Sequence, residues 1–290
     1  MVDKSAAPPL VKRAAQTVSV AAGRLTSSAR MLPDFLIAGG QRCGTTSMYR
    51  ALSAHPAVLK PVLHKGVHYF DTGYERNLAW YRGHFPLRIT VRRVQERMGV
   101  RPRVFESAPY YLCHPLAGER IARDLPGVQL IVLLRDPVER AYSAHAHELA
   151  RGFETEASFE RALALEEERL AGEEQKIIEN PSYHSHSHQH HAYLDRGRYI
   201  DYLERLEKRF GRDRLHVVDS HEFFATPEPV YDDVVSFLGL PHMGRPPFKR
   251  HNARERSPLP KALRARLMDH FEPYDARLAD WLGRPPSWRR

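Results

Sequence analysis

The chain has 290 residues, with 44 Lys and Arg against 35 Asp and Glu, which gives a formal net charge of +9. Its 42% hydrophobic and 27% charged residues are typical of a globular protein and exclude a chain that is mainly disordered. No apolar run approaches the roughly 20 residues of a membrane span, and two cysteines are too few for a disulfide scaffold. The basic balance favours an anionic ligand without identifying it.

The first 32 residues differ in composition from the rest. Over residues 11–30, basic side chains are interspersed among Ala, Val, Leu and Ser, and the apolar stretch Val18–Ala22 is too short for a signal peptide. We expect a basic N-terminal extension, either frayed or folded as a docking helix. A helix on an anionic membrane surface is the alternative.

From Asp34 onward, short apolar runs alternate with amphipathic segments. The expected strands are Phe35–Ala38, Val104–Phe105, Leu130–Leu134 and Leu215–Val218. The expected helices are Thr46–Ser53, Leu116–Leu125, Val138–Ala150, Ser158–Ala171, Tyr199–Phe210, Val230–Leu238 and Pro260–Leu282. This alternation predicts an α/β fold with a central parallel sheet flanked by helices in three layers, formed by a single domain over residues 33–290.

Two glycines, Gly39 and Gly44, enclose four residues between the first strand and the first helix, a spacing typical of phosphate-binding loops. Glycines let the backbone curl, so that N–H groups and the helix N-terminus point at one anion. A nucleoside triphosphatase would have lysine where this chain has Thr45, and Arg42 is the cation of the loop. The loop is therefore P-loop-like but unsuited to a triphosphate; alternatively, it is a tight turn without a ligand.

A second anion site is predicted where the strand Leu130–Leu134 ends. Arg135 follows the strand directly, and Ser143 lies eight residues further on, in the next expected helix. Ligands of parallel α/β sheets bind at the carboxyl ends of the strands, and a guanidinium with a hydroxyl suits a phosphate. Alternatively, Arg135 pairs with Asp136 or Glu139. Two anion sites at two strand ends predict a ligand with two separated anionic groups.

These two segments resemble the sulfotransferases that use 3′-phosphoadenosine 5′-phosphosulfate (PAPS). Gln-Arg-Cys-Gly-Thr-Thr-Ser at residues 41–47 resembles the family's 5′-phosphosulfate loop, and Leu130–Ser143 resembles its 3′-phosphate site. The resemblance is strongest to the carbohydrate branch, which includes the heparan sulfate sulfotransferases and bacterial relatives. Further similar segments are Lys65–Asp71, Glu106–Tyr111, Arg196–Tyr199 and Phe237–Leu240.

The resemblance implies transfer of the sulfuryl group from PAPS to a hydroxyl or amine of a carbohydrate, glycolipid or small molecule, by in-line displacement and without a metal. Adenosine 3′,5′-bisphosphate would be the second product. The resemblance places Arg42 at the position of the family's catalytic loop lysine, and Arg135 and Ser143 at the 3′-phosphate. The other donor-binding residues that it implies are Gln41, Cys43, Gly44, Thr45, Thr46, Ser47, Tyr199, Lys249 and Arg250.

The general base is where this chain departs from its relatives. Their glutamate base is replaced by Gly66, and we expect His68, two residues further in an extended segment, to take its role. Glu106 is the second candidate; alternatively, His68 only hydrogen-bonds inside the crevice. Ser107 stands where the relatives have a lysine, which argues against an inherited heparan-like acceptor contact.

Five histidines gather in one segment, Ser182–His191. Since no paired cysteines or carboxylates accompany them, we expect a polar loop over the acceptor crevice, with a zinc or nickel site as the alternative. The Glu-rich stretch Glu166–Glu174 is expected to be an exposed helix face. The five histidines are His184, His186, His188, His190 and His191.

A different class of protein remains open, a basic α/β protein that binds nucleic acid or nucleotides without sulfotransfer. The arginines are interpreted as scattered among acids, and no nucleic-acid motif is present, which disfavours this class. The family's Golgi members have a membrane anchor that this sequence lacks. We therefore expect a cytoplasmic location, with peripheral membrane contact through residues 11–30 as an option, while the acceptor and the oligomeric state stay open.

Overall fold

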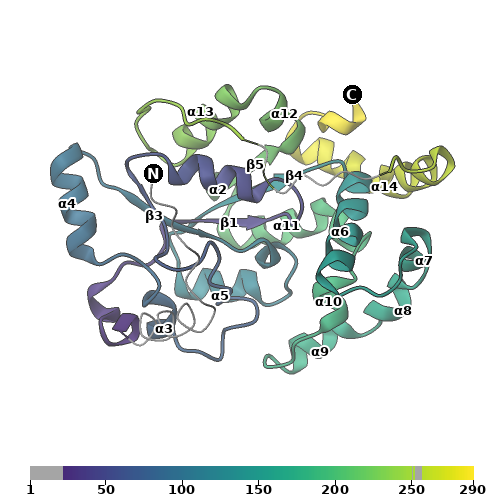
Figure 1. Ribbon diagram of the computed structural model, residues 1–290, viewed down its shortest axis with the longest axis horizontal. Helices are drawn as coiled ribbons and strands as arrows, with labels where there is room; N and C mark the ends of the chain where they lie inside the picture. Colours follow the sequence, from purple (N-terminus) through teal and green to yellow (C-terminus); the bar gives the residue numbers. More distant parts are fainter. Residues whose placement is uncertain (1–21, 250, 252–256) are drawn as a thin grey trace, which may run out of the picture.

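The computed structural model describes residues 22–249, 251 and 257–290 (Figure 1). Most of the predicted segment 11–30, and Arg250, therefore lie outside the described residues. All strand pairs of the sheet are parallel, and the strand order is β2-β3-β1-β4-β5. The strands are β1 (Phe35–Gly39), β2 (Val58–Leu59), β3 (Arg103–Ser107), β4 (Gln129–Leu134) and β5 (Leu215–Asp219).

The four predicted strands are confirmed, and the short edge strand β2 was not predicted. The central strand β1 is buried along its whole length, between β3 and β4. A strand covered on both faces needs an apolar side chain at nearly every position, which is why Phe35–Ala38 reads as a continuous apolar run. The predicted parallel α/β fold is confirmed.

Helices cover both faces of the sheet and complete three layers. In Figure 1, α2, α12 and α13 lie on one side of the sheet, and α5 and α11 lie on the other. The bounds are α2 (Thr45–Ser53), α5 (Ala117–Asp124), α11 (Tyr199–Phe210), α12 (Ser220–Ala225) and α13 (Pro227–Phe237). Two short helices precede β3, namely α3 (Leu78–Arg82) and α4 (Arg88–Met98).

A group of helices with its own hydrophobic cluster packs beside the sheet. Phe271 at its centre is fully buried and packs with Val138, Phe159 and Tyr193. The helices of this group are α6 (Pro137–Arg151), α7 (Phe159–Ala164), α8 (Glu166–Leu170), α9 (Glu173–Glu179), α10 (His186–His190) and α14 (Lys261–Leu282). The 3₁₀ helices are η1 (Ser27–Ala29), η2 (Pro109–Leu112), η3 (Asp195–Gly197), η4 (Arg212–Arg214) and η5 (Ser287–Arg289).

Two predictions for this region are wrong. The single helix expected over Ser158–Ala171 is split into α7 and α8, and the polar loop expected over Ser182–His191 contains the helix α10. The Glu-rich stretch is also not uniformly exposed, because Glu166 is buried and accepts the backbone N–H groups of Leu194 and Asp195. A buried acceptor in that role serves tertiary structure, which periodicity alone does not reveal.

The sheet brings the two predicted anion sites together. Leu36 and Ile37 of β1 pair with Leu130 and Ile131 of β4, and the N–H of Gly40 donates to the carbonyl of Leu133 at 2.8 Å. The loop after β1 and the segment after β4 therefore leave the same edge of the sheet side by side. This edge is formed by the carboxyl ends of the strands, where ligands of such sheets bind.

Candidate active site

The loop after β1 ends at a helix N-terminus without a side-chain cap. Gly44 is the N-cap of α2 with φ of 90°, no side chain caps the helix, and its first turn holds no acidic residue. The first N–H groups of a helix have no partner within the helix, so the start of α2 favours an anion. A Cβ on Gly44 would lie 3.0 Å from the ring of Phe224. The position therefore requires glycine for both its backbone conformation and its space.

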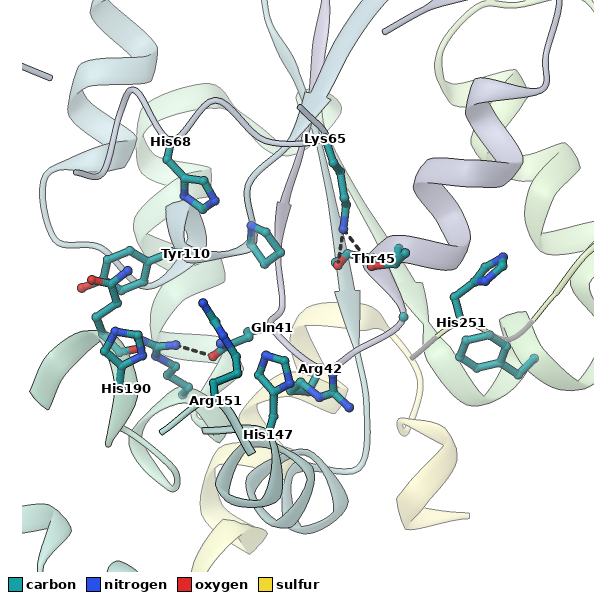
Figure 2. Close-up of a pocket in the computed structure, with 16 residues that line it drawn as sticks. Gln41, Arg42, Thr45, Lys65, His68, Tyr110, His147, Arg151, His190 and His251 are labelled. Atoms are coloured by element: carbon teal, nitrogen blue, oxygen red, sulfur yellow. Dashed lines mark hydrogen bonds between the residues drawn. The ribbon is translucent and has the colours of Figure 1, made fainter. Parts of the chain in front are cut away.

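A cavity of about 330 Å³ opens in front of this loop. Figure 2 shows its lining side chains, with Lys65 and His68 on one wall and His147 and Arg151 of α6 on the other. None of the described residues that line it is a carboxylate. The lining residues are Gln41, Arg42, Gly44, Thr45, Thr46, Lys65, His68, Pro109, Tyr110, His147, Arg151, Gln189, His190, Arg196, Phe224 and His251.

Lys65 points at the start of α2, and sequence reasoning did not select it. Its Nζ donates to the hydroxyl oxygens of Thr45 and Thr46, at 3.1 Å each (Figure 2). Burial lowers the pKa of Lys65 to about 8, because desolvation disfavours the ammonium form. An anion at the helix N-terminus would favour the charged form. The signal that could have found it was its place at the start of the similar segment Lys65–Asp71.

His68 lines the same cavity and is held by a buried carboxylate. Its Nδ1 lies 2.8 Å from Oδ2 of Asp71, whose side chain is fully buried. A carboxylate only accepts, so Nδ1 donates and Nε2 keeps its lone pair. Burial works to lower the pKa of His68, but the hydrogen bond and the charge of Asp71 outweigh it, and the pKa is raised. This arrangement suits a general base.

The expected extended conformation at His68 is wrong. The residue has φ of 56°, in the left-handed region, and residues 64–68 form no strand. The alternation argument that placed His68 on the face of the missing carboxylate therefore does not hold, although the side chain still lines the cavity.

Gly66 lies against the end of β3. A Cβ there would lie 2.5 Å from the carbonyl oxygen of Ser107, and the N–H of Ser107 donates to the carbonyl of Lys65 at 2.9 Å. This close backbone approach leaves no space for a glutamate at position 66 unless the two segments separate. The chain thus has a tight backbone contact at the position where the resemblance implies a glutamate.

The second candidate base, Glu106, lies beneath the cavity and does not line it. Its side chain is fully buried and accepts from the hydroxyls of Tyr81 and Tyr111, at 2.6 and 3.0 Å, and from the N–H of Val67 at 2.5 Å. Burial raises the pKa of Glu106 against the effect of these hydrogen bonds. In this arrangement Glu106 holds the segment that carries His68.

A second cavity, of about 310 Å³, adjoins the first and contains Arg135. Arg135 donates to the carbonyl of Arg42 at 3.4 Å and pairs with Glu139 at 3.3 Å, so the ion pair considered from the sequence is present at the cavity wall. The two cavities share Arg42, Gly44 and Phe224. The remaining lining residues are Cys43, Asp136, Glu139, Ser220, His221, Ser287 and Trp288.

Arg42 joins the two predicted sites directly. Its Nε donates to the hydroxyl of Ser143, at 3.1 Å, and its backbone adopts φ of 68°. Ser143 is buried on α6 and lines neither cavity, so Arg42 covers it. The predicted neighbourhood of the loop and the Arg135–Ser143 segment is thus present, with the Ser143 hydroxyl engaged by the loop.

Two other predicted residues, Tyr199 and Cys43, are buried behind the loop after β1. Tyr199 is buried, its hydroxyl donates to the carbonyl of Arg135 at 2.8 Å, and it lies 3.7 Å from Sγ of Cys43. It lines neither cavity, and its expected contact with the adenine stays a prediction. Burial raises the pKa of the Cys43 thiol, which packs as an apolar group. The backbone carbonyl of Cys43 accepts a hydrogen bond from the hydroxyl of Ser220.

Of the two predicted tail residues, the structure describes Lys249 and not Arg250. Lys249 is exposed and lines a separate cavity of about 170 Å³ together with Ser47. The N–H of His251 donates to the hydroxyl of Ser47 at 3.1 Å, and His251 lines the first cavity. Lys249 is not among the residues that line the cavity of Arg135, and its assignment to the 3′-phosphate stays a prediction.

Gln41 is fixed by a network that sequence reasoning missed. Its amide donates to Glu148 at 3.1 Å and accepts from Arg196 at 2.5 Å, and Glu148 lies 2.9 Å from Nδ1 of His190. Arg196 also donates to two carbonyls of α10, including that of Gln189 at 2.9 Å. The network ties α6 and α10 to the loop after β1.

The histidine-rich segment forms part of the cavity wall through His190. The ring of His190 stacks on Phe153 at 4.2 Å between centroids, and His186 and His191 both bond the carbonyl of Phe153. Among the residues that the structure describes, no group of three or more His, Cys, Asp or Glu side chains is placed to hold a metal ion. In the same part of the chain, no helix has the length and apolar character needed to cross a bilayer.

Comparison with known proteins supports this fold and shows the family of the chain. Residues 32–251 match the family model described as "Sulfotransferase domain". Among solved structures, a sulfotransferase from Alicyclobacillus acidocaldarius superposes with a TM-score of 0.66 and 29% identity, over 90% of this chain and 100% of that one.

Curated relatives include enzymes of the carbohydrate type. A membrane-associated sulfotransferase of Dictyostelium discoideum is 23% identical over 89% of this chain and 67% of its own length. Human bifunctional heparan sulfate N-deacetylase/N-sulfotransferase 3 is 28% identical over 73% of this chain, which spans 23% of that protein. Human heparan sulfate glucosamine 3-O-sulfotransferase 5 is 26% identical over 75% of this chain and 56% of its own length.

Proposed function

This chain belongs to the sulfotransferase domain family, and from that premise we propose that it transfers the sulfuryl group of PAPS to a hydroxyl or amine of a carbohydrate, glycolipid or small molecule. The observation that carries the proposal is the pair of adjoining cavities that share Arg42 and Gly44. One cavity contains the uncapped start of α2 and the other contains Arg135, so one adenosine ligand with separated 5′ and 3′ anions fits across both.

The protein's part in the reaction is positioning and charge stabilisation. N–H groups at the start of α2, with Thr45 and Thr46, hold the 5′-phosphate, and Arg135 holds the 3′-phosphate. Arg42 and Lys65 place positive charge beside the oxygen that bridges phosphorus and sulfur. That oxygen leaves with the electron pair of its bond to sulfur, so a nearby cation stabilises the transition state.

His68 removes the acceptor's proton in the proposed mechanism. As the acceptor oxygen or nitrogen forms its bond to sulfur, Nε2 of His68 takes the proton, and the Asp71 carboxylate stabilises the imidazolium that results. The bridging oxygen stays on the 5′-phosphate, which gives adenosine 3′,5′-bisphosphate and the sulfated acceptor. No metal takes part in this scheme.

The acceptor side of the first cavity is rich in basic side chains. His147, Arg151 and His190 face it from α6 and α10, and no carboxylate is among its described lining residues. Together with relatives named for heparan sulfate, this lining supports a saccharide acceptor that carries negative charge. The cytoplasmic location expected from the sequence stays a prediction.

Two measurements test the function. In a thermal-shift assay, adenosine 3′,5′-bisphosphate should raise the melting temperature more than ADP or ATP, because only it can engage both cavities. With radiolabelled PAPS and a panel of saccharide acceptors, label should move to at least one acceptor. Equal shifts for the three nucleotides would reject the 3′-phosphate site and favour a general nucleotide-binding protein; absence of transfer in the presence of a selective shift would reject the proposed acceptor class.

A further inference from the structure

One strongly basic stretch of the chain lies apart from the candidate active site. Residues 76–103 contain eight arginines against one glutamate, which gives this segment a net charge of +7. The segment forms α3, α4 and the start of β3. In Figure 1 it lies at the left end of the molecule, away from α6 and α10 beside the candidate active site. We call residues 22–34 and 76–103 the arginine lobe.

Within the arginine lobe, one side of α4 packs against the protein and the other side exposes arginines to solvent. Val91 is its buried residue, while Arg92, Arg93 and Arg97 are exposed at neighbouring positions on the outward side. Arg92 pairs with Glu96 at 3.1 Å, and both side chains remain largely in solvent. An exposed pair of this kind contributes little to stability, so the fold does not account for this row of guanidinium groups.

A cavity of about 410 Å³ lies on the same lobe. It is lined by four arginines and two aspartates, and Arg101 pairs with Asp34 at 2.8 Å. The Nε of Arg82 is buried and has no hydrogen-bond partner among the described residues. Asp34 precedes β1, so this cavity lies at the amino ends of the strands, opposite the candidate active site. Its charged lining residues are Arg30, Arg82, Arg88, Arg101, Asp34 and Asp124.

Large aliphatic side chains are exposed beside these arginines. Leu25, Val62 and Ile89 are 87%, 60% and 49% exposed, and they are three of the five large exposed hydrophobic residues among those described. Their segments are in contact, because the N–H of Val62 donates to the carbonyl of His84 and Arg30 forms a β-bridge with Leu87. Cationic and aliphatic groups on one surface match the interface of a bilayer, where phosphates and acyl chains meet.

We propose that the arginine lobe docks on a bilayer of anionic phospholipids. The arginines of α4 and of the 410 Å³ cavity contact lipid phosphates, and Leu25 and Ile89 enter the headgroup region. A nucleic acid is disfavoured as the occupant, since its bases stack on aromatic side chains and the exposed apolar groups here are aliphatic. Docking in this way leaves the candidate active site facing the aqueous phase.

The test is co-sedimentation of the full chain with vesicles of phosphatidylcholine, with and without phosphatidylglycerol. The chain should bind only the vesicles that contain phosphatidylglycerol, and added salt should weaken binding. The triple variant Arg92→Glu, Arg93→Glu, Arg97→Glu should lower the partition coefficient at least about tenfold. The matched control, Lys208→Glu, Arg209→Glu, Lys261→Glu, changes the net charge equally at exposed positions on α11 and α14 and should retain binding.

Each other outcome overturns the proposal. Equal losses in both triple variants would mean that net charge alone attracts the chain, and equal binding to both vesicle types would exclude recognition of anionic lipid. An increase in melting temperature with glycerol 3-phosphate, without vesicle binding, would assign the cavity to a free phosphate ester, and binding of homopolymeric RNA without vesicle binding would assign a nucleic acid. The thermal shift with adenosine 3′,5′-bisphosphate should be the same in all variants, which shows that they are folded and keeps this test separate from the proposed function.

Discussion

Arg135 is the residue on which recognition of the 3′-phosphate depends in this account. Arg135→Ala should raise the Kd for adenosine 3′,5′-bisphosphate about 10- to 100-fold, as expected when a charge-assisted hydrogen bond is lost. The Kd for adenosine 5′-monophosphate, which lacks the 3′ group, should change little. Titration calorimetry of both nucleotides measures the difference. Arg277→Ala on the outer side of α14 is the control, since Arg277 pairs only on the surface with Asp201 and Glu204. Equal weakening of both nucleotides would mean that Arg135 acts only by supporting the loop at Arg42.

Asp71 should tune the base through the hydrogen bond to His68. The base acts in its neutral form, so kcat/KM falls as pH drops through the pKa of His68, which Asp71 raises. Asp71→Asn removes this charge and lowers that pKa, so the acid limb of the pH profile should move to lower pH. The maximal rate should fall about tenfold or more, because the tautomer of His68 is no longer fixed.

In the variant His68→Ala, the acid limb of the pH profile should disappear and turnover should fall, while the affinity for the nucleotide is kept. If the acid limb of the pH profile is unchanged in both variants, a residue other than His68 is the general base.

Gly44 should tolerate no side chain. Gly44→Ala forces an L residue to adopt φ of 90° and places its Cβ 3.0 Å from the ring of Phe224. The substitution should therefore lower the free energy of unfolding by about 1–3 kcal/mol. It should also weaken binding of adenosine 3′,5′-bisphosphate at least about tenfold. Gly99→Ala is the matched control, since Gly99 has φ of 72° at the end of α4 with open space around its Cβ position. It should cost about 1 kcal/mol and leave nucleotide binding unchanged. Chemical denaturation and calorimetry check both variants; normal binding by Gly44→Ala would contradict an anion site at this loop.

At the scale of elements, α10 is held against the loop by one buried cation. Arg196 donates to Gln41 and to the carbonyls of His188 and Gln189, so Arg196→Met should release α10 from the loop and lower the free energy of unfolding by about 2–4 kcal/mol. Because α10 forms the acceptor wall through His190, KM for the acceptor should rise more than Kd for the nucleotide. Arg205→Met, which removes a surface pair with Glu174, is the control. A rise confined to the nucleotide Kd would contradict this role for α10.

The elements that could be predicted from the sequence are those with strong local patterns. The run Leu130–Leu134 reads as a buried strand because both of its faces are covered, and Gly44 and Gly239 mark the start of α2 and the end of α13 by their backbone requirements. The helices α3, α4 and α10 were not predicted, since each is short or rich in polar residues. Their formation depends on tertiary contacts, such as the hydrogen bonds from Arg196 to two carbonyls of α10.

The sequence predicts the residues of the two loops that lie next to the anion positions. It does not predict the residues that reach the cavities from other elements. Glycine spacing and the Arg135 motif identify the residues next to the anion positions, because those residues are contiguous in sequence. Asp71, Arg196 and His147 reach the site from distant elements through packing, which no spacing rule encodes. The backbone at His68 and the close contact of Gly66 likewise depend on β3, a separate part of the chain.

At the scale of the whole molecule, the sheet separates two charged regions. Its carboxyl edge carries the two joined cavities, and its amino edge carries the arginine lobe. The single domain over residues 33–290 stays a prediction. The matched family residues, 32–251, cover nearly all elements that form the two cavities, while Ser287 and Trp288 close the second cavity from outside that range.

A crystal structure with adenosine 3′,5′-bisphosphate tests the central claim most directly. One nucleotide should span both cavities, with its 5′-phosphate at the N-terminus of α2 beside Lys65 and its 3′-phosphate on Arg135. A nucleotide bound elsewhere, or one held in the reverse direction with neither phosphate at these groups, would contradict it.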